Sequence, residues 1–225
     1  MGLRYTPVAD HAVLVEFTDL SQEVALARVR HLDAAVGQAG MLGVRECVPA
    51  MVSLLVCFDP ILTDHVAITR GLQALEGVVM PLHAVAKVHA VPLCYEADVA
   101  PDLAEVAARV GMSVEAVIAA HLAGEYCVFM YGFAPGYAYL NGVPQCLHLP
   151  RKPAAKRGVA AGSVIVAGGQ CLMTTLVMPT GWWIIGRSPV RVLQDDTARP
   201  FLFNVGDHVR FHRITRTALE AAWQS

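Results

Sequence analysis

The segment 128–150 reads VFMYGFAPGYAYLNGVPQCLHLP, and it is the part of the chain that decides the fold of the second half. It contains three glycines, three prolines and three tyrosines. Glycine permits positive φ or a close approach of backbone, and proline fixes φ and removes a hydrogen-bond donor. The segment therefore predicts a rigid turn lined by aromatic side chains.

Four cationic residues, Arg151, Lys152, Lys156 and Arg157, follow this turn at once. Arginine offers a planar two-pronged donor and lysine a compact charge, and both suit a carboxylate or a phosphate. One interpretation is that the turn and the cations form a wall of a cleft for an anion. The other is a β-barrel corner followed by a solvated loop, because Gly/Pro turns are common punctuation.

The rest of the second half alternates short elements with Gly and Pro. Two short helices are expected first, at residues 101–110 and 113–121, joined by Gly111. Only strand patterns follow, and they occur at residues 126–133, 163–167, 182–185, 190–193 and 209–211. Several short strands with this punctuation predict a closed or partly closed barrel.

The first 90 residues carry a different pattern. A strand at 11–17 precedes a helix that Ser21 can cap and that runs to about residue 38. Strands at 44–48 and 52–58, a helix at 63–75 and a strand at 83–91 complete the unit. The order β-α-β-β-α-β is that of a ferredoxin-like domain. The sequence thus predicts an α+β protein with an α/β domain at 1–90 and a β-barrel domain at 91–225.

Composition narrows the classes of function. The formal net charge is −2, charged residues make up 16% and hydrophobic residues 55%. A near-neutral chain is unlike a general nucleic-acid binder, which needs a basic face. The low fraction of charged residues indicates that a partner covers part of the apolar surface. No apolar run reaches the length of a signal peptide or membrane span, so we expect a cytoplasmic protein whose six scattered cysteines stay reduced.

Several residues could carry chemistry, and each has a structural alternative. His121 ends a helix, where its cation would also complement the helix dipole. Ser163 in AAGSV and Gln170 in AGGQ supply a hydroxyl and an amide, although Gly-Gly is also a common turn. Trp182 and Trp183 must face opposite sides of a strand, and Arg187 follows them as a possible anion clamp.

Signals for cofactors are weak. His208 and His212 share a strand face but have no third ligand, so we predict no metal. The glycines form neither a Walker loop nor a nucleophile elbow, and ATP binding by this chain alone is therefore unsupported. Acidic residues are sparse in the β region, so chemistry there would rest on cations, hydroxyls and amides, or on groups that a partner supplies.

Five blocks in order, GFAPGYAYL, LPRK, AGSVIVAGGQ, GWWIIGRSP and VGDHVRF, resemble the family of the 5-oxoprolinase B-subunit, also called allophanate hydrolase subunit 1, which includes a sporulation-kinase inhibitor. The N-terminal strings DHAVLVEF and VPAMVSLLVCFDP resemble it too, so the resemblance covers nearly the whole chain. It implies that the barrel is cyclophilin-like. It also implies a homologous cyclophilin-like second subunit as partner, with a third subunit in the oxoprolinase version.

The same resemblance implies an ATP-dependent hydrolase of a cyclic amide, which opens 5-oxoproline to glutamate. ATP would be used by the complex, because phosphorylating the lactam oxygen makes a poor electrophile open to water. His121 and Ser163 are the implied proton-handling residues. The implied substrate-binding residues are Pro135, Gly136, Tyr137, Tyr139, Arg151, Lys152, Gln170, Trp182 and Arg187, with Gly132 shaping the turn.

The chain departs from the family pattern in the loops expected to face the ligand. Ala155 and Ala160 stand where the family has proline, and Thr174 and Thr175 replace a Tyr-Pro pair. These changes suggest a kept scaffold with a shifted substrate. Three alternatives therefore stay open: an allophanate or urea-derivative hydrolase, a carboxyltransferase-type subunit handling a biotin-linked intermediate, and a regulator that docks on a histidine kinase. The sequence identifies neither the substrate nor the nucleophile.

Overall fold

The computed structural model describes residues 2–77 and 86–224, and its contacts divide the chain into two compact units, Met1–Val85 and Ala86–Ser225. The sequence placed the boundary at 90/91 instead. The difference arises from strand β5 (Val88–Cys94), whose residues pair along their whole length with a strand near the C-terminus. We describe each unit by itself.

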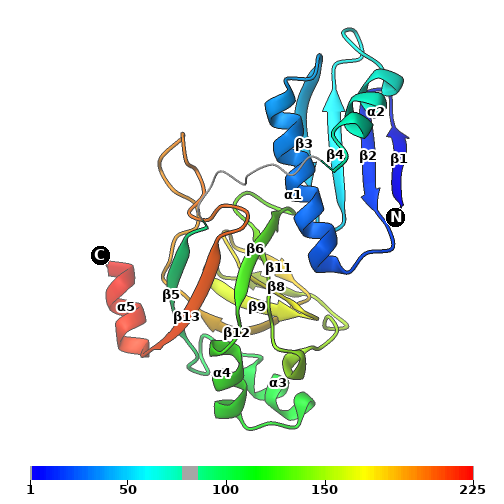
Figure 1. The fold of residues 1–225 in the computed structure, drawn as a ribbon. Coiled ribbons are helices and arrows are strands. Elements are labelled where there is room, and N and C mark those ends of the chain that lie inside the picture. The colour runs from blue at the N-terminus through cyan, green and yellow to red at the C-terminus, as the bar shows by residue number, and fades with distance from the viewer. Residues whose placement is uncertain (1, 78–85, 225) are drawn as a thin grey trace. The chain divides into compact units, whose positions relative to one another are not determined.

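The first unit is a four-stranded antiparallel sheet with two helices on one face (Figure 1). The strand order is β1-β2-β4-β3, and alternate residues of β2 and β4 pack against the helices. Ser21 caps α1 by accepting from the Val24 amide, and Gly40 ends it in the left-handed region. The elements are β1 (Leu3–Val8), β2 (Ala12–Phe17), α1 (Gln22–Ala39), β3 (Val44–Pro49), β4 (Ser53–Phe58) and α2 (His65–Ala74).

The ferredoxin-like prediction for this unit is not confirmed. The observed order is β-β-α-β-β-α, because residues 3–8 form a strand that pairs with β2 as a hairpin. Pro7 argues against a strand in the sequence, because proline is disfavoured inside a sheet. It is tolerated here because β1 lies at the edge of the sheet. The predicted strand at 83–91 is partly outside the described residues, and its described part is the start of β5, in the second unit.

The second unit is a closed barrel, as the Gly/Pro punctuation predicted, and it is consistent with a cyclophilin-like barrel. Its strands follow the order β10-β7-β6-β13-β5-β12-β9, and β9 pairs with β10 to close the ring. Among the barrel strands that the structure describes, only β5 and β13 pair in parallel. The strands are β6 (Tyr126–Tyr131), β7 (Ala138–Asn141), β9 (Ser163–Ala167), β10 (Gln170–Met173), β12 (Trp183–Arg187) and β13 (His208–Ile214).

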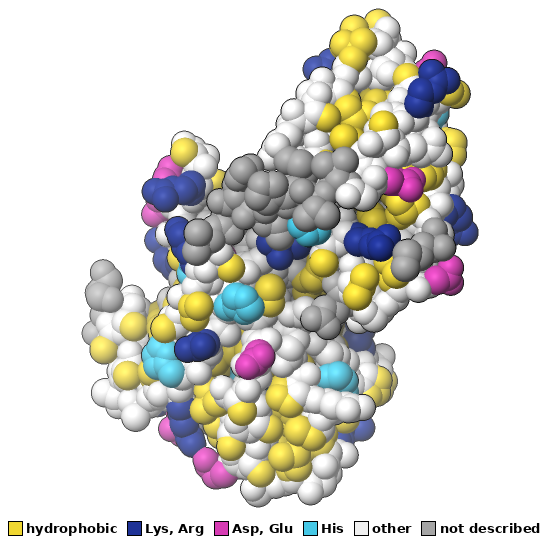
Figure 2. Space-filling view, viewed as in Figure 1, with side chains coloured by type: hydrophobic (Ala, Val, Ile, Leu, Met, Phe, Trp, Pro, Cys, Tyr) yellow, Lys and Arg dark blue, Asp and Glu magenta, His cyan; other side chains and the backbone are white. Residues whose placement is uncertain are grey.

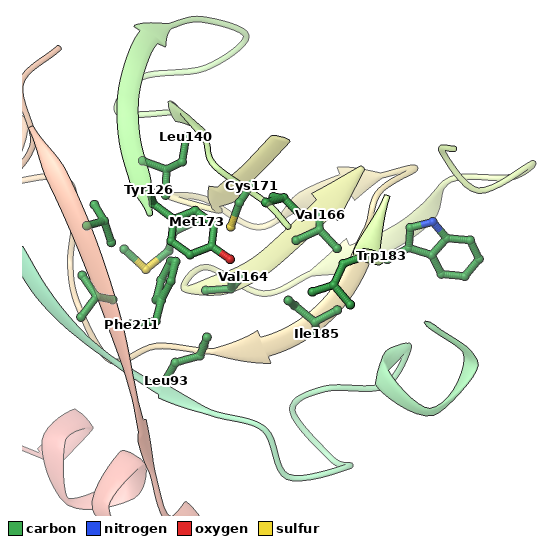
Figure 3. Packing of buried hydrophobic residues seen from close by; sticks show 14 of the residues in the cluster. Leu93, Tyr126, Leu140, Val164, Val166, Cys171, Met173, Trp183, Ile185 and Phe211 are labelled. Carbon is green, nitrogen blue, oxygen red and sulfur yellow. The ribbon is translucent and has the colours of Figure 1, made fainter. Parts of the chain in front are cut away.

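The barrel interior is a packed core rather than a channel. Figure 3 shows side chains from several strands meeting inside, among them Tyr126, Cys171 and Phe211, all of them buried. Helices α3 (Leu103–Val110) and α4 (Val114–Leu122) add apolar side chains to this core at one end of the barrel (Figure 1). Gly111 and Ser113 cap these helices, which confirms the predicted break between them.

A second layer covers part of the barrel's outer surface. It is a two-stranded sheet of β8 (Lys156–Val159) and β11 (Met178–Thr180). A short 3-10 helix, η1 (Gln145–Leu147), and a C-terminal helix, α5 (Arg216–Gln224), complete the unit. The predicted strand at 190–193 is wrong, because only Leu193 makes an isolated bridge, to Phe201.

Charged side chains are scattered on the face of the molecule that Figure 2 shows, and hydrophobic side chains lie exposed between them. Among the helices that the structure describes, none combines the length and the hydropathy that a membrane crossing requires.

Candidate functional site

Strand alternation sorts the conspicuous residues of the second unit into two layers. Trp183 and Ile185 belong to the barrel core, whereas Trp182 and Ile184 belong to a separate cluster on the outer side, under β8 and β11. This confirms that the two tryptophans face opposite sides. The outer cluster contains Tyr137 and is joined by the half-buried Tyr139.

A pocket of about 140 Å³ opens in this outer cluster. Four residues predicted from the sequence line it together: Tyr137, Tyr139, Arg151 and Trp182. They come from the turn before β7, from β7, from the loop after η1 and from the residue just before β12. Its other lining residues are Phe133, Ile165, Leu172, Pro179, Thr180 and Gly181.

Aromatic rings form the walls of this pocket. Phe133 and Tyr137 have ring centroids 5.5 Å apart, and Tyr139 meets Trp182 edge-on at 5.9 Å. The Arg151 guanidinium carbon lies 5.7 Å from the centre of the Trp182 ring, which is within cation–π range. No carboxylate among the described residues pairs with Arg151, and none of the described lining residues is acidic. The pocket therefore offers an aromatic wall and one uncompensated cation.

The Gly/Pro turn positions the tyrosines as the sequence suggested. The Gly132 amide donates to the Tyr137 carbonyl at 3.2 Å and so closes the turn. Gly136 has φ of 73°, and a Cβ there would lie 2.8 Å from the Leu193 side chain. Pro135 lies outside the pocket lining, where its carbonyl accepts from the Thr175 hydroxyl at 2.8 Å. Pro135 and Gly136 thus shape the loop and do not reach the pocket themselves.

The phenols of the pocket stay protonated at neutral pH. Burial raises the pKa of Tyr137 to about 12, and the Tyr137 hydroxyl donates to the Met178 sulfur. Burial also raises the pKa of Tyr139, although the nearby Arg151 charge acts in the opposite direction. Both residues are therefore hydrogen-bond donors at physiological pH.

Lys152 lies next to Arg151 in sequence but has a different environment. Its ammonium pairs with Asp102 at 2.5 Å, and both side chains are mostly buried. The same Asp102 oxygen accepts from the Ile184 amide at 2.8 Å. Lys152 thus ties α3 to the barrel and does not line the pocket.

Arg187 and Ser163 also lie outside this pocket. They are register partners in β12 and β9. The Arg187 guanidinium donates to the Ala161 carbonyl at 3.2 Å and lies 4.3 Å from the centre of the Trp223 ring in α5. The Ser163 side chain is almost fully buried. The geometry therefore does not bring Arg187 together with Arg151.

His121 and Gln170 take other places. His121 is fully buried, its Nδ1 lies 2.7 Å from the Tyr95 hydroxyl, and burial lowers its pKa to about 3. It is held among Tyr126 and Phe211 inside the barrel, so a proton exchanged there cannot reach the outer pocket directly. Gln170 begins β10 and is half-buried outside the pocket lining.

Sequence reasoning missed part of the pocket. Phe133 is 73% exposed at the rim with φ of 69°, a conformation that a non-glycine residue adopts rarely. The sequence signal that could have identified Phe133 as a pocket residue was its position inside the GFAPG motif. Thr180 also lines the pocket, and its hydroxyl accepts from the Trp182 amide at 3.1 Å. No group of three or more metal-ligating side chains occurs in the part of the chain that the structure describes.

Comparison with known proteins points to one family. The family described as "Carboxyltransferase domain, subdomain C and D" matches residues 3–203. The chain is 31% identical over 228 residues to the 5-oxoprolinase B-subunit of Bacillus subtilis (strain 168), covering 96% of this chain and 95% of that protein.

Two solved structures extend the comparison. The chain matches the structure of TTHA0988 with a TM-score of 0.79 and 34% identity, over 92% of this chain. It spans only 40% of the TTHA0988 chain. The urea amidolyase of K. lactis shares the fold, with a TM-score of 0.78 at 17% identity, over 97% of this chain and 15% of that one.

Proposed function

The chain belongs to the carboxyltransferase domain C/D family, together with proteins named as the 5-oxoprolinase B-subunit, and from this premise we propose that it is part of an ATP-dependent hydrolase that opens 5-oxoproline to glutamate. The observation that carries the proposal is the outer pocket, where Arg151, which has no carboxylate partner among the described residues, lies beside Tyr137, Tyr139 and Trp182.

The chemistry of the pocket suits this substrate. 5-Oxoproline carries one carboxylate on a small apolar ring with an amide. The Arg151 guanidinium binds the carboxylate, and the faces of Tyr139 and Trp182 pack against the ring methylenes. The Tyr139 hydroxyl, protonated because burial raises its pKa, donates to an oxygen of the substrate. These residues bind and orient the substrate.

The remaining chemistry is assigned to a partner. A lactam is a poor electrophile, and ATP supplies a phosphoryl group that activates its oxygen for attack by water. A pocket of about 140 Å³ suits a small ring and not a nucleotide, so ATP does not share this pocket, and we propose that a partner subunit binds it. The described lining residues include no acid to serve as a general base, which also requires a contribution from a partner. The proposed partner is a homologous cyclophilin-like second subunit, with a third subunit possible in the complex.

The test is ADP release by the reconstituted complex, with and without 5-oxoproline. Arg151→Ala removes a charge-assisted hydrogen bond of about 1.5–3 kcal/mol, so the KM for 5-oxoproline rises about tenfold to a hundredfold. Arg210→Ala, an exposed arginine on β13, serves as the matched control and keeps normal kinetics. Stimulation by 5-oxoproline that is unchanged in the Arg151 variant would refute the assignment.

An amide of the urea type is the second candidate substrate. The sequence departures at Thr174 and Thr175 motivate it. In the structure the Thr174 hydroxyl donates to the Ala160 carbonyl at 2.7 Å and the Thr175 hydroxyl to the Pro135 carbonyl, so both hydroxyls hold loop backbone in place. ADP release stimulated by allophanate and not by 5-oxoproline would select this alternative, and co-purification with a histidine kinase in place of a homologous subunit would select the regulator.

A further inference from the structure

A larger pocket, of about 560 Å³, lies at a different place on the second unit. It is at the end of the barrel where the parallel strands β5 and β13 begin and β6 ends. Lys87, His89 and Tyr131 form its floor, and the loop from Gln194 to Val205 forms its other wall. None of the predicted site residues lines it.

The centre of this pocket is a histidine held by a buried carboxylate. The His89 Nε2 atom lies 2.8 Å from Asp207 Oδ2, and Asp207 is only 3% exposed. Asp207 also accepts from the backbone amides of Lys87 at 3.0 Å and Asn204 at 2.9 Å. Burial acts to raise the pKa of Asp207, but these hydrogen bonds outweigh it and lower the pKa, so the carboxylate is charged.

This arrangement directs the second ring nitrogen of His89 outward. Since a charged carboxylate only accepts, Nε2 is the protonated nitrogen and Nδ1 is the acceptor in the neutral ring. Nδ1 has no hydrogen-bond partner among the described residues, and it is not one of the buried polar atoms left without a partner. The His89 side chain is 16% exposed and lines the pocket, so this nitrogen is available to a ligand there.

One cation at the pocket has no ion pair among the described residues. Six charged or titratable side chains of the described residues line the pocket or pack against it, and they are Lys87, His89, Tyr131, Asp196, Arg199 and Asp207. Asp207 pairs with His89, and Asp196 pairs with Arg199 at 3.5 Å. Lys87 is exposed and has no ion pair among the described residues. Lys87 is therefore the cation of this pocket that is available to pair with the carboxylate of a ligand.

Aromatic side chains hold the walls in place. The Phe201 ring stacks on Tyr131 with a centroid distance of 5.0 Å, and the Tyr131 hydroxyl donates to the Phe203 carbonyl at 2.5 Å. Phe203 meets the His89 ring edge-on at 5.0 Å. The pocket is therefore preformed, with apolar rings beside one cation and one free imidazole nitrogen.

We infer that this pocket is a second ligand site, which binds a small monocarboxylate that also carries an N–H or O–H group. Lys87 pairs with the carboxylate, and His89, oriented by Asp207, accepts a hydrogen bond from the ligand through Nδ1. The inference rests on the proposed function only in the choice of 5-oxoproline as the probe, because that molecule carries a carboxylate and a ring N–H.

The test is nitrogen-15 NMR of the histidine rings in the unmodified chain, titrated with 5-oxoproline up to about 10 mM, above the usual range of substrate affinities. His89→Asn identifies the His89 signals. We expect those signals to shift on titration, and the shift to require about tenfold to a hundredfold more ligand in Lys87→Ala, as loss of a charge-assisted contact predicts. His212, exposed on β13, is the control ring and does not shift.

Two comparisons make the result decisive. 2-Pyrrolidinone, the same ring without the carboxylate, shifts the His89 signals much less if Lys87 binds the carboxylate, and an equal shift would overturn that role. Arg151→Ala keeps the His89 shift, because the two pockets are separate. No shift of His89 in the unmodified chain would overturn the inference, whether or not the reconstituted complex releases ADP. If the His89 signals shift but the reconstituted complex releases no ADP, the result supports this second site and refutes the proposed function.

Discussion

Replacing Asp102 by alanine tests whether Lys152 is a structural residue and Arg151, its neighbour, a binding residue. Asp102 joins α3 to the barrel through three contacts. Its carboxylate pairs with Lys152 at 2.5 Å and accepts from the Ile184 amide at 2.8 Å, and its own amide donates to the Ile184 carbonyl at 3.1 Å. The side-chain exposures of Lys152 and Asp102 are 12% and 13%.

The magnitude follows from that burial. Removing one partner of a buried ion pair leaves the other charge uncompensated, which costs about 3–5 kcal/mol. The Asp102→Ala variant also leaves the Ile184 amide without its acceptor. With a urea m-value of about 2 kcal/mol/M, the unfolding midpoint of the barrel unit falls by about 1.5–2.5 M. The alanine at residue 102 keeps its backbone bond to Ile184, so the fold is retained at low urea.

The assay is urea unfolding followed by tryptophan fluorescence, because Trp182, Trp183 and Trp223 all lie in the second unit and the signal reports only on the barrel. The matched control is Asp98→Ala, which removes an exposed partner of Arg216 and leaves the midpoint near that of the unmodified protein. An Asp102→Ala midpoint equal to that of the control would refute the reasoning and return Lys152 to the candidate binding residues.

Two further predictions concern the barrel. Gly142→Ala places a Cβ 2.0 Å from the Glu125 carbonyl oxygen at φ of 97°, so we expect the free energy of unfolding to fall by more than about 3 kcal/mol. Gly111→Ala, with φ of 68° and open space, lowers it by about 1–2 kcal/mol. Equal unfolding midpoints of the two variants in urea would contradict the clash. His121 is neutral when folded because burial lowers its pKa from 6.5 to about 3, so the unfolded chain binds the extra proton and stability falls by about 1.4 kcal/mol per pH unit as the pH drops below about 6.5. His121→Gln removes that slope, and a slope that persists unchanged would show that other groups cause it.

Local signals predicted much of the fold. Ser21 and Ser113 marked helix starts because a serine side chain satisfies a free amide in the first turn, and both do so. The barrel followed from short strands separated by Gly and Pro. The prediction for the first unit was not confirmed because strand pairing can join residues that lie far apart in the sequence. The segment 88–94 reads as the next strand of the preceding unit, but its partner is β13, more than a hundred residues later.

The residues of the candidate site were predictable where the alternation of side chains along a strand determines which face each residue occupies. The GFAPGYAYL motif places Tyr137 and Tyr139 on one side of the chain, with Ala138 on the other, and Trp182 faces the same outer cluster. Arg187 was grouped with them because it follows the two tryptophans in the GWWIIGRSP motif and because the family resemblance implied it. The separation of Arg187 from Arg151 depends on where each end of β12 lies and on α5, whose Trp223 covers the Arg187 guanidinium. No pattern in the sequence connects residue 223 to residue 187.

The contrast between the two pockets argues for shared catalysis. The pocket at Arg151 can hold an anion but has no acid or neutral imidazole among its described lining residues, and His121, which the sequence favoured, is enclosed in the barrel core. The pocket at His89 has an oriented imidazole whose second nitrogen has no partner among the described residues, but Lys87, its cation without an ion pair among those residues, lacks the two-pronged geometry of a guanidinium. Among the described lining residues, neither pocket combines an unpaired guanidinium with a positioned imidazole. Under the proposed function, hydrolysis of an activated lactam requires groups from a partner subunit, and we predict that the isolated chain binds 5-oxoproline without releasing ADP.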